Sequence, residues 1–360
     1  MSDNLVFRAG AKALRSIRRH GLRPEMVKVI LGAAGGPRWL VLHGLDRVIF
    51  SSWFKGRSEP LYLLGSSIGS WRFAAVSQNN PVEALDRFLS SYIGQRYSQD
   101  PTPEEITLQA SKMLSTLLGP CGAGEILNHP FLRLHVVAAH CKWPVASDNS
   151  LLLSLGLMDA AIYNAVHSGG LKYFFDRALF FDPRDVPRFA ETVEVFAKRA
   201  ALSAQNLKPA LLASASIPLL MQGVRNIPGA PEGTYRDGGV MDYHFDLPLL
   251  EDDEDEDRMV LFPHYMDRII PGWFDKGLPW RKPHASNMDR VLLVSPSKEF
   301  IERLPNKKIP DRDDFTLFKG RDEDRVAYWN EVIEAGACLG EDLQQAVETG
   351  AIAEFVQPID

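Results

Sequence analysis

The sequence predicts an α/β protein with a mostly parallel central sheet flanked by helices. Two units of strand, loop and helix follow each other directly, and apolar runs of strand length alternate with helical periodicity afterwards. The first unit has a strand at 26–31, a glycine-rich loop at 32–37 and a helix at 39–50, and the second has a strand at 61–64, a turn at 65–69 and a helix at 70–77. Because a helical crossover returns the chain in parallel, these units predict a parallel sheet.

The remaining elements follow from the same patterns. Short apolar runs predict strands at 132–139, 179–181, 257–262 and 290–295. Apolar residues at helical spacing predict helices at 159–166, 186–200, 208–216, 322–338 and 341–349. The helix at 208–216 is expected to stop at Pro218, because proline cannot continue a helix. Without a repeat or a long linker, we expect a single domain with a basic segment at 1–25, a main unit at 26–250 and a C-terminal extension at 251–360 that packs on it.

Composition excludes several classes of protein. The chain has 360 residues, of which 45% are hydrophobic and 24% charged, which is typical of a folded globular protein and not of a disordered one. A net charge of −6 argues against nucleic acid as a partner. Cys121, Cys141 and Cys338 fit neither a disulfide framework nor a zinc motif. No secretory signal or membrane span is apparent, so we expect a cytoplasmic protein with, at most, peripheral contact at the inner face of a membrane.

The turn Gly65-Ser66-Ser67-Ile68-Gly69 matches the G-x-S-x-G pattern of a nucleophile elbow. In this motif a serine stands on a strained turn between a strand and a helix, and glycines let the backbone approach closely. The predicted strand before the turn and the helix after it supply the expected context. Ser67 is therefore the candidate nucleophile, with a helix-capping serine in an ordinary turn as the alternative interpretation.

Two other glycine-rich elements carry candidate functional groups. The loop at 34–38 contains Gly35, Gly36 and Arg38, and its N–H groups could hold an oxyanion, although it could also be a simple turn. Asp237 precedes Gly238 and Gly239 far along the chain. A carboxylate within reach of a serine hydroxyl can accept its proton directly, which predicts a nucleophile and base pair without histidine.

These elements, in this order, resemble the patatin-like phospholipase family. The resemblance covers about residues 26–250 and includes the segment 211–218, which is similar to the family's A-S-x-A-x-P motif. It implies a patatin-like three-layer domain related to the α/β-hydrolases, and a lipase or phospholipase A-type enzyme that cleaves lipid carboxylic esters without a cofactor or a metal. The residues that match the family's sites are the catalytic Ser67 and Asp237, the oxyanion-hole residues Gly35, Gly36, Arg38 and Ile68, and the motif glycines Gly65, Gly69, Gly238 and Gly239.

Two alternatives stay open at this point. Ala34 and Trp39 stand where glycines are common in the family, which keeps a non-catalytic lipid-binding or regulatory protein in view. An esterase with a Ser-His-Asp triad is the second alternative, because His244 and His264 follow Asp237 in the appropriate chain order.

Three further segments have less specific interpretations. The acidic run 251–257 is expected to be a solvated loop, since calcium loops interleave their ligands with a turn glycine. The segment 262–280 carries Trp273 and Trp280 and is interpreted either as an aromatic lid or as ordinary loop packing. The basic N-terminal segment is expected to be a helix that packs on the core, with contact to an anionic membrane as the alternative.

Overall fold

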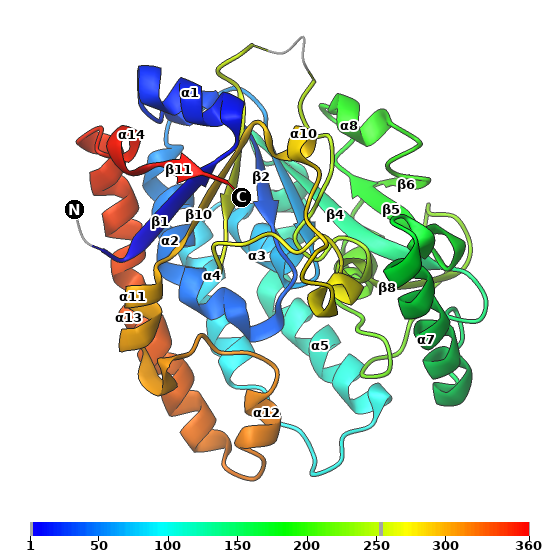
Figure 1. Cartoon of the computed structure of the whole chain (residues 1–360). Helices are drawn as coiled ribbons and strands as arrows, with labels where there is room; N and C mark the ends of the chain where they lie inside the picture. Colours follow the sequence, from blue (N-terminus) through cyan, green and yellow to red (C-terminus); the bar gives the residue numbers. More distant parts are fainter. Residues whose placement is uncertain (1–2, 252–254, 360) are drawn as a thin grey trace.

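The described residues, 3–251 and 255–359, form one central sheet of eleven strands in the computed structural model (Figure 1). The strands are β1 Leu5–Ala9, β2 Val27–Gly32, β3 Leu61–Ser66, β4 Leu132–Cys141, β5 Phe175–Phe181, β6 Lys198–Ala201, β7 Val224–Arg225, β8 Thr234–Asp237, β9 Met259–Pro263, β10 Val291–Pro296 and β11 Gln357–Pro358. Their order is β11-β1-β10-β9-β2-β3-β4-β5-β6, with β7 and β8 attached through β4.

The centre of the sheet is parallel, as the sequence predicted. Strands β10, β9, β2, β3 and β4 pair in parallel, whereas β1 and β5 are antiparallel to their inner neighbours β10 and β4. The parallel strands are buried almost throughout, as expected for a sheet with both faces covered. The fold is therefore mixed α/β, with a large and mostly parallel sheet.

Helices flank this sheet. They are α1 Ala11–His20, α2 His43–Val48, α3 Ile68–Val76, α4 Pro81–Ile93, α5 Pro103–Leu118, α6 Gly122–Leu127, α7 Ser150–Val166, α8 Arg188–Glu191, α9 Leu207–Ser214, α10 Ala285–Met288, α11 Lys298–Arg303, α12 Asp314–Leu317, α13 Asp322–Glu348 and α14 Ile352–Phe355. Helices α3 and α9 pack directly on β4. No helix of the described ranges combines the length and apolarity needed to cross a membrane.

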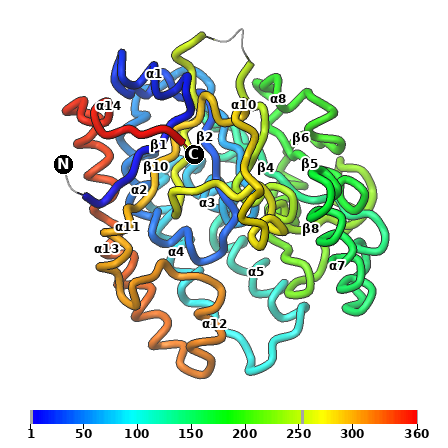
Figure 2. Tube along the Cα trace, in the orientation of Figure 1, coloured from blue at the N-terminus to red at the C-terminus, as the bar shows by residue number. Residues whose placement is uncertain are grey.

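Both ends of the chain contribute to the same edge of the sheet. Strand β1 pairs with β10 and with β11, and Figure 2 shows the N- and C-terminal segments side by side. The sequence predicted only a helix for the N-terminal segment, and β1 was missed. Leu5, Phe7 and Ala9 are buried on one face of β1, and Arg8 lies on the other face. Because Arg8 belongs to a basic stretch, the alternation was not recognised as that of a strand.

The C-terminal extension supplies central strands. β9 lies between β2 and β10, so the described residues 255–359 share the sheet with the preceding part of the chain. The domain boundaries at 26 and 250 stay a prediction.

The structure differs from the prediction at three of the expected helices. Residues 186–200 form only the four-residue helix α8 and the strand β6, because β6 completes the sheet by pairing with β5, and this pairing overrides the local helical pattern. The two helices expected at 322–338 and 341–349 are one continuous helix, α13. A Cβ on Gly340 would lie 2.5 Å from the Gly44 carbonyl oxygen, so this glycine permits close packing on α2 and does not end the helix.

Candidate active site

The register of β4 brings Ser67 and Asp237 together from distant parts of the sequence. β3 pairs with residues 132–137 of β4, and its last pair is Ser66 with Val137. β8 pairs with residues 138–141, and its pair nearest to β3 joins Asp237 to Ala138. β5 pairs with the other side of β4 over residues 135–141, so β3 and β8 follow each other along one edge. Ser67, one residue after β3, therefore lies beside the end of β8.

The turn at Ser67 has the geometry of a nucleophile elbow. Ser67 has φ of 54° and ψ of −128°, a strained conformation for a residue with a side chain. The glycines two residues before and after Ser67 have no room for a side chain. A Cβ on Gly65 would lie 2.6 Å from the Ser70 backbone nitrogen, and one on Gly69 would lie 2.0 Å from the Gly32 carbonyl oxygen. The strained serine is thus held where β2, β3 and α3 meet.

Gly69→Ala is expected to lower the free energy of unfolding by about 3 kcal/mol or more, because a methyl group there would overlap backbone atoms that cannot move independently. Gly124→Ala is the matched control, since no heavy atom lies within 4 Å of the added Cβ. Urea denaturation of both variants measures the difference. Equal stability of the two variants would contradict the described packing of the elbow.

Ser67 and Asp237 form a direct, buried hydrogen bond. The Ser67 hydroxyl donates to Asp237 Oδ2 at 2.7 Å, and the Gly239 N–H donates to Asp237 Oδ1 at the same distance. Burial raises the pKa of Asp237 above its ordinary value, while Arg312, the two hydrogen bonds and Lys276 act in the opposite direction. A buried carboxylate with a raised pKa is a better proton acceptor than an exposed one.

A second serine, which the sequence did not single out, positions the first. Ser214, at the end of α9, accepts a hydrogen bond from the Ser67 N–H at 2.9 Å and donates to the Val137 carbonyl at 2.6 Å. The Asp237 N–H donates to the carbonyl of Ser216. The segment 211–218 therefore contacts both halves of the pair. Its resemblance to a family motif was the available signal for this role.

The glycine loop lies against the same turn. Gly36 and Ile68 line one cavity with Ser67. Gly36 begins a 3-10 helix, Gly36–Leu42, and Ile68 begins α3, and the first N–H groups of a helix have no acceptor within it. Gly36 has φ of 57°, which favours glycine. Gly35 packs against the ring of Tyr265, which lies 2.7 Å from where a Cβ would stand. Backbone groups from two different elements thus lie beside the cavity that contains Ser67.

Arg38 has partners within the fold. Its guanidinium donates to the Tyr243 hydroxyl at 2.8 Å, lies 3.7 Å from an oxygen of Asp311 and stacks 5.4 Å from the centre of the Tyr265 ring. Arg38 is not among the residues that line the cavity with Ser67. These contacts attach the glycine loop to the segments that carry Tyr243, Tyr265 and Asp311.

The two departures from the family pattern are accommodated by their surroundings. Ala34 lies against Gly239, which has no Cβ to meet its methyl group. Trp39 is buried in the core, where its ring stacks on Phe88 at a centroid distance of 4.6 Å. Neither side chain lines the cavity that contains Ser67.

Two cavities meet at the pair. The larger one, about 570 Å³, contains Ser67, and apolar side chains line much of it: Ile68, Trp71, Ile106, Met113, Ile217 and Phe315. The smaller one, about 70 Å³, contains Asp237 and is lined by Leu157, Leu219 and Trp273. Arg312 lines both. A cavity of several hundred cubic ångströms lined largely by apolar side chains, with charged groups such as Arg312 and Asp322 on its wall, is typical of a site for a ligand with a large apolar part.

Neither candidate histidine is hydrogen-bonded to Ser67 or Asp237. His244 bonds the Tyr265 hydroxyl through Nε2 at 2.7 Å and accepts the Ile270 N–H through Nδ1 at 2.9 Å. His264 bonds the backbone of Met266 through Nδ1. Burial lowers the pKa of both rings, that of His264 to about 3. The hydrogen bonds of Asp237 go to Ser67 and Gly239, not to a histidine.

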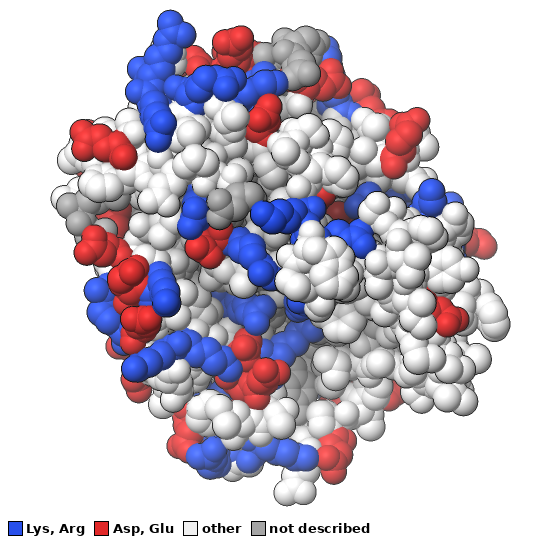
Figure 3. All heavy atoms as spheres, viewed as in Figure 1, with Lys and Arg blue, Asp and Glu red and all other residues white. Residues whose placement is uncertain are grey.

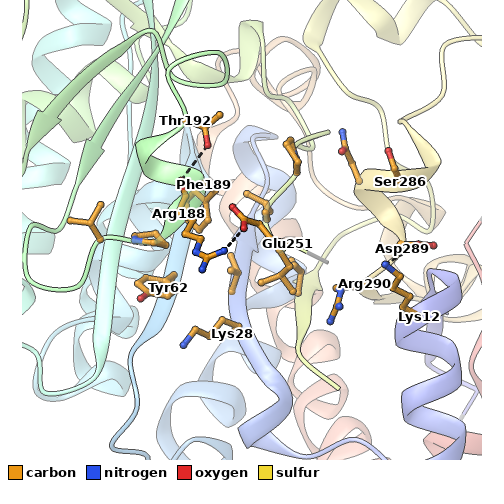
Figure 4. Close-up of a pocket in the computed structure, with 18 residues that line it drawn as sticks. Lys12, Lys28, Tyr62, Arg188, Phe189, Thr192, Glu251, Ser286, Asp289 and Arg290 are labelled. Atoms are coloured by element: carbon orange, nitrogen blue, oxygen red, sulfur yellow. Dashed lines mark hydrogen bonds and ion pairs between the residues drawn. The ribbon is translucent and has the colours of Figure 1, made fainter. Parts of the chain in front are cut away.

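A third cavity lies at the opposite end of the sheet. Its volume is about 730 Å³, and it is lined at the amino ends of the strands, for example by Lys28 and Arg290 (Figure 4). Arg188 and Glu251 form an ion pair at its wall. The acidic run 251–257 begins here, but residues 252–254 lie outside the described residues. Elsewhere in the described chain, no group of three His, Cys, Asp or Glu side chains is arranged to hold a metal ion.

Comparisons with known proteins give distant structural similarity alone. No protein-family model matches the chain, and no curated protein is similar to it. VipD from Legionella pneumophila has 12% sequence identity and a TM-score of 0.31, with 67% of this chain and 50% of VipD covered. Human GIVD cytosolic phospholipase A2 has 11% identity and a TM-score of 0.32, with 95% of this chain and 63% of that enzyme covered.

The chain therefore spans half the length of VipD and less than two thirds of the human enzyme. At these TM-scores neither structure assigns a function, and the site has to be interpreted from its own residues.

Proposed function

We propose that the chain is a serine acyl hydrolase of the lipase or phospholipase A type, with a patatin-like Ser67 and Asp237 dyad. The observation that carries this proposal is the 2.7 Å hydrogen bond from a serine hydroxyl, on a strained turn, to a buried carboxylate. An ordinary capping serine requires neither the strained backbone nor a buried acid.

In the proposed mechanism Ser67 Oγ attacks the acyl carbonyl carbon, and its proton passes to Asp237 Oδ2. The N–H groups of Gly36 and Ile68 hold the tetrahedral oxyanion, and Gly35 and Arg38 keep the loop in place. Collapse of the intermediate breaks the ester C–O bond, and Asp237 returns the proton to the leaving alcohol. Water then attacks the acyl-enzyme with Asp237 again as base, which releases the carboxylic acid and free Ser67.

The cavities favour an ester with a long apolar part. The cavity of about 570 Å³ beside Ser67 is lined mainly by aliphatic and aromatic side chains, which suits an acyl chain. Lipid carboxylic esters are therefore the substrate class that we propose. Phospholipid and neutral-lipid substrates share this acyl part.

The hydrogen bonds favour the dyad over the alternatives. Both nitrogens of His244 are used by Tyr265 and Ile270, which leaves it without a free nitrogen for Asp237. The accommodation of Ala34 and Trp39 weakens the case for a non-catalytic protein, since neither blocks Ser67. Reaction with a fluorophosphonate tests the function itself, because only an activated serine reacts with it.

We further propose that a lipid surface contacts α7 and the tryptophans near it. Helix α7 exposes apolar side chains along one face, at Leu151, Leu155, Met158, Ile162 and Val166, with exposed fractions of 46% to 69%. In Figure 3 the part of the molecule where α7 lies carries few charged side chains. A continuous exposed apolar face of this kind marks an interaction surface.

The position of this face favours lipid as its partner. Leu157 of α7 and the exposed Trp273 both line the small cavity with Asp237, so the apolar face continues to the site. Asn164 of α7 donates to Asp275 at 2.7 Å in the interior, which attaches the helix to the Trp273 segment. The basic helix α1 is bonded to Asp289, at the amino end of β10, and thus lies away from Ser67. We therefore place the lipid contact at α7 and not at the N-terminal segment.

Ile162→Glu is expected to reduce hydrolysis of phospholipid vesicles at least about fivefold, because a charge on the contact face weakens insertion into the interface. Hydrolysis of a soluble short-chain ester should change by less than about twofold, since Ile162 is 56% exposed and does not line either cavity at the dyad.

Phe355→Glu is the matched control, because Phe355 is 51% exposed and belongs to α14, beside the other edge of the sheet. Equal vesicle rates for the two variants would contradict a lipid contact at α7. If the wild-type chain self-associates and Ile162→Glu abolishes this association, the apolar face of α7 contacts a second copy of the chain instead.

A further inference from the structure

Arg312 lies in the candidate site and is not paired with any side chain of the described residues. It is half-buried, and within residues 3–251 and 255–359 its guanidinium makes no hydrogen bond, ion pair or ring contact. Removing a cation from water without a compensating partner is costly, so such groups are normally paired. An unpaired arginine in a cavity is therefore a candidate for binding a ligand.

Arg312 lies close to the proposed oxyanion loop and to the dyad. Arg312 Nε lies 3.2 Å from where a Cβ on Gly36 would stand, so the guanidinium is next to the proposed oxyanion loop. Arg312 also lines both the cavity that contains Ser67 and the one that contains Asp237. Arg312 is thus close to the place where the acyl part and the alcohol part of a bound ester would meet.

The nearby acidic side chains are already neutralised by other cations. Asp311 and Asp314 both accept hydrogen bonds from Lys308 at 2.9 Å. On the cavity wall, Asp100 pairs with Lys319 at 2.9 Å, and Asp322 pairs with Arg325 at 3.0 Å. None of these carboxylates forms an ion pair with Arg312, which acts on the buried Asp237 through space, by lowering its pKa, but is not paired with it.

The other arginine near the loop is not available in this way. Arg38 is held by Tyr243, Tyr265 and Asp311 and does not line the cavity. Arg38, which the resemblance assigns to the oxyanion hole, is therefore bonded within the fold, whereas Arg312 comes from a segment outside the recognised motifs.

We propose that Arg312 binds an oxyanion group, phosphate or carboxylate, which the ester substrate carries beside its scissile bond. A guanidinium presents paired N–H donors that match the two oxygens of such a group. The acyl chain would occupy the apolar cavity, and the anion would orient the ester over Ser67. This inference rests on the proposed hydrolase function and makes Arg312 a specificity-determining residue.

The test compares two soluble esters that differ only in the anion. Dihexanoyl phosphatidic acid and dihexanoylglycerol, both below their micellar concentrations, share acyl chains and glycerol. The wild-type ratio of kcat/KM, phosphate ester over neutral ester, is expected to exceed 1 and to fall at least about tenfold in Arg312→Gln, as loss of a charge-assisted contact implies.

The ratio of the two kcat/KM values is unaffected by the indirect effect of Arg312→Gln on the proposed base, Asp237. Arg312 lowers the pKa of Asp237, as does Lys276, so Arg312→Gln raises it and slows both substrates alike at low pH. Arg312→Lys keeps the charge without the paired donors and should restore part of the ratio. Arg321→Gln is the matched control, because its guanidinium lies in the same part of the chain but does not line the cavity.

Each outcome separates the inference from the function on which it rests. If wild type hydrolyses neither ester and shows no reaction with a fluorophosphonate, the hydrolase function fails. If Arg312→Gln reacts with the fluorophosphonate but its ratio equals that of wild type, the anion inference alone is overturned. A third outcome would also overturn the anion inference. Inorganic phosphate would inhibit hydrolysis of the neutral ester by wild type but not by Arg312→Gln, while the kcat/KM ratio stays unchanged in the variant. Arg312 would then bind a free anion and not a group of the substrate.

Discussion

Asp237→Asn is expected to lower kcat for ester hydrolysis by at least about four orders of magnitude while the protein remains folded. Asparagine keeps the size of the side chain, and its carbonyl oxygen can still accept the Gly239 N–H. It cannot take the proton of Ser67, and in the dyad no second base is present. The measurement is the rate with a short-chain aryl ester, together with a thermal unfolding curve.

Histidine variants are the controls for the Asp237→Asn prediction, because they distinguish a dyad from a triad. His244→Asn and His264→Asn should each retain kcat within about tenfold when folded, because neither ring is bonded to Ser67 or Asp237. A folded histidine variant as inactive as Asp237→Asn would replace the dyad by a triad. Both rings are buried, so the unfolding curve is needed to exclude loss of structure.

Ser67→Ala is expected to abolish ester hydrolysis entirely, since it removes the only atom proposed to bond to the acyl group. Ser66→Ala is an unusually close control. Ser66 is adjacent and fully buried, and its hydroxyl has no partner among the described residues. We expect it to change kcat by less than about threefold. Parallel loss in both variants would show that the effect comes from the turn and not from the nucleophile.

The local parts of this site were predictable from the sequence because they depend on neighbours along the chain. The strand β3, the turn at Ser67 and the helix α3 occupy consecutive residues, and the close packing of Gly65 and Gly69 is built into that turn. The parallel centre of the sheet followed from two such units in succession.

What was missed depends on pairing between distant segments. The alternation of β1 is only five residues long and β6 has only four residues, and each strand forms because an edge of the sheet is available. The contact of Ser214 with the Ser67 N–H requires α9 to lie on β4, which no local pattern reveals. Likewise, Arg312 reaches the site only through the folding of the C-terminal extension.

The measurement that tests the central proposal most directly is intact-mass and peptide mapping after reaction with a fluorophosphonate. We expect one covalent adduct per chain, located on Ser67, absent in Ser67→Ala and retained in Ser66→Ala. Failure of the folded wild-type chain to react, or an adduct that persists in Ser67→Ala, would contradict a nucleophilic Ser67 activated by Asp237.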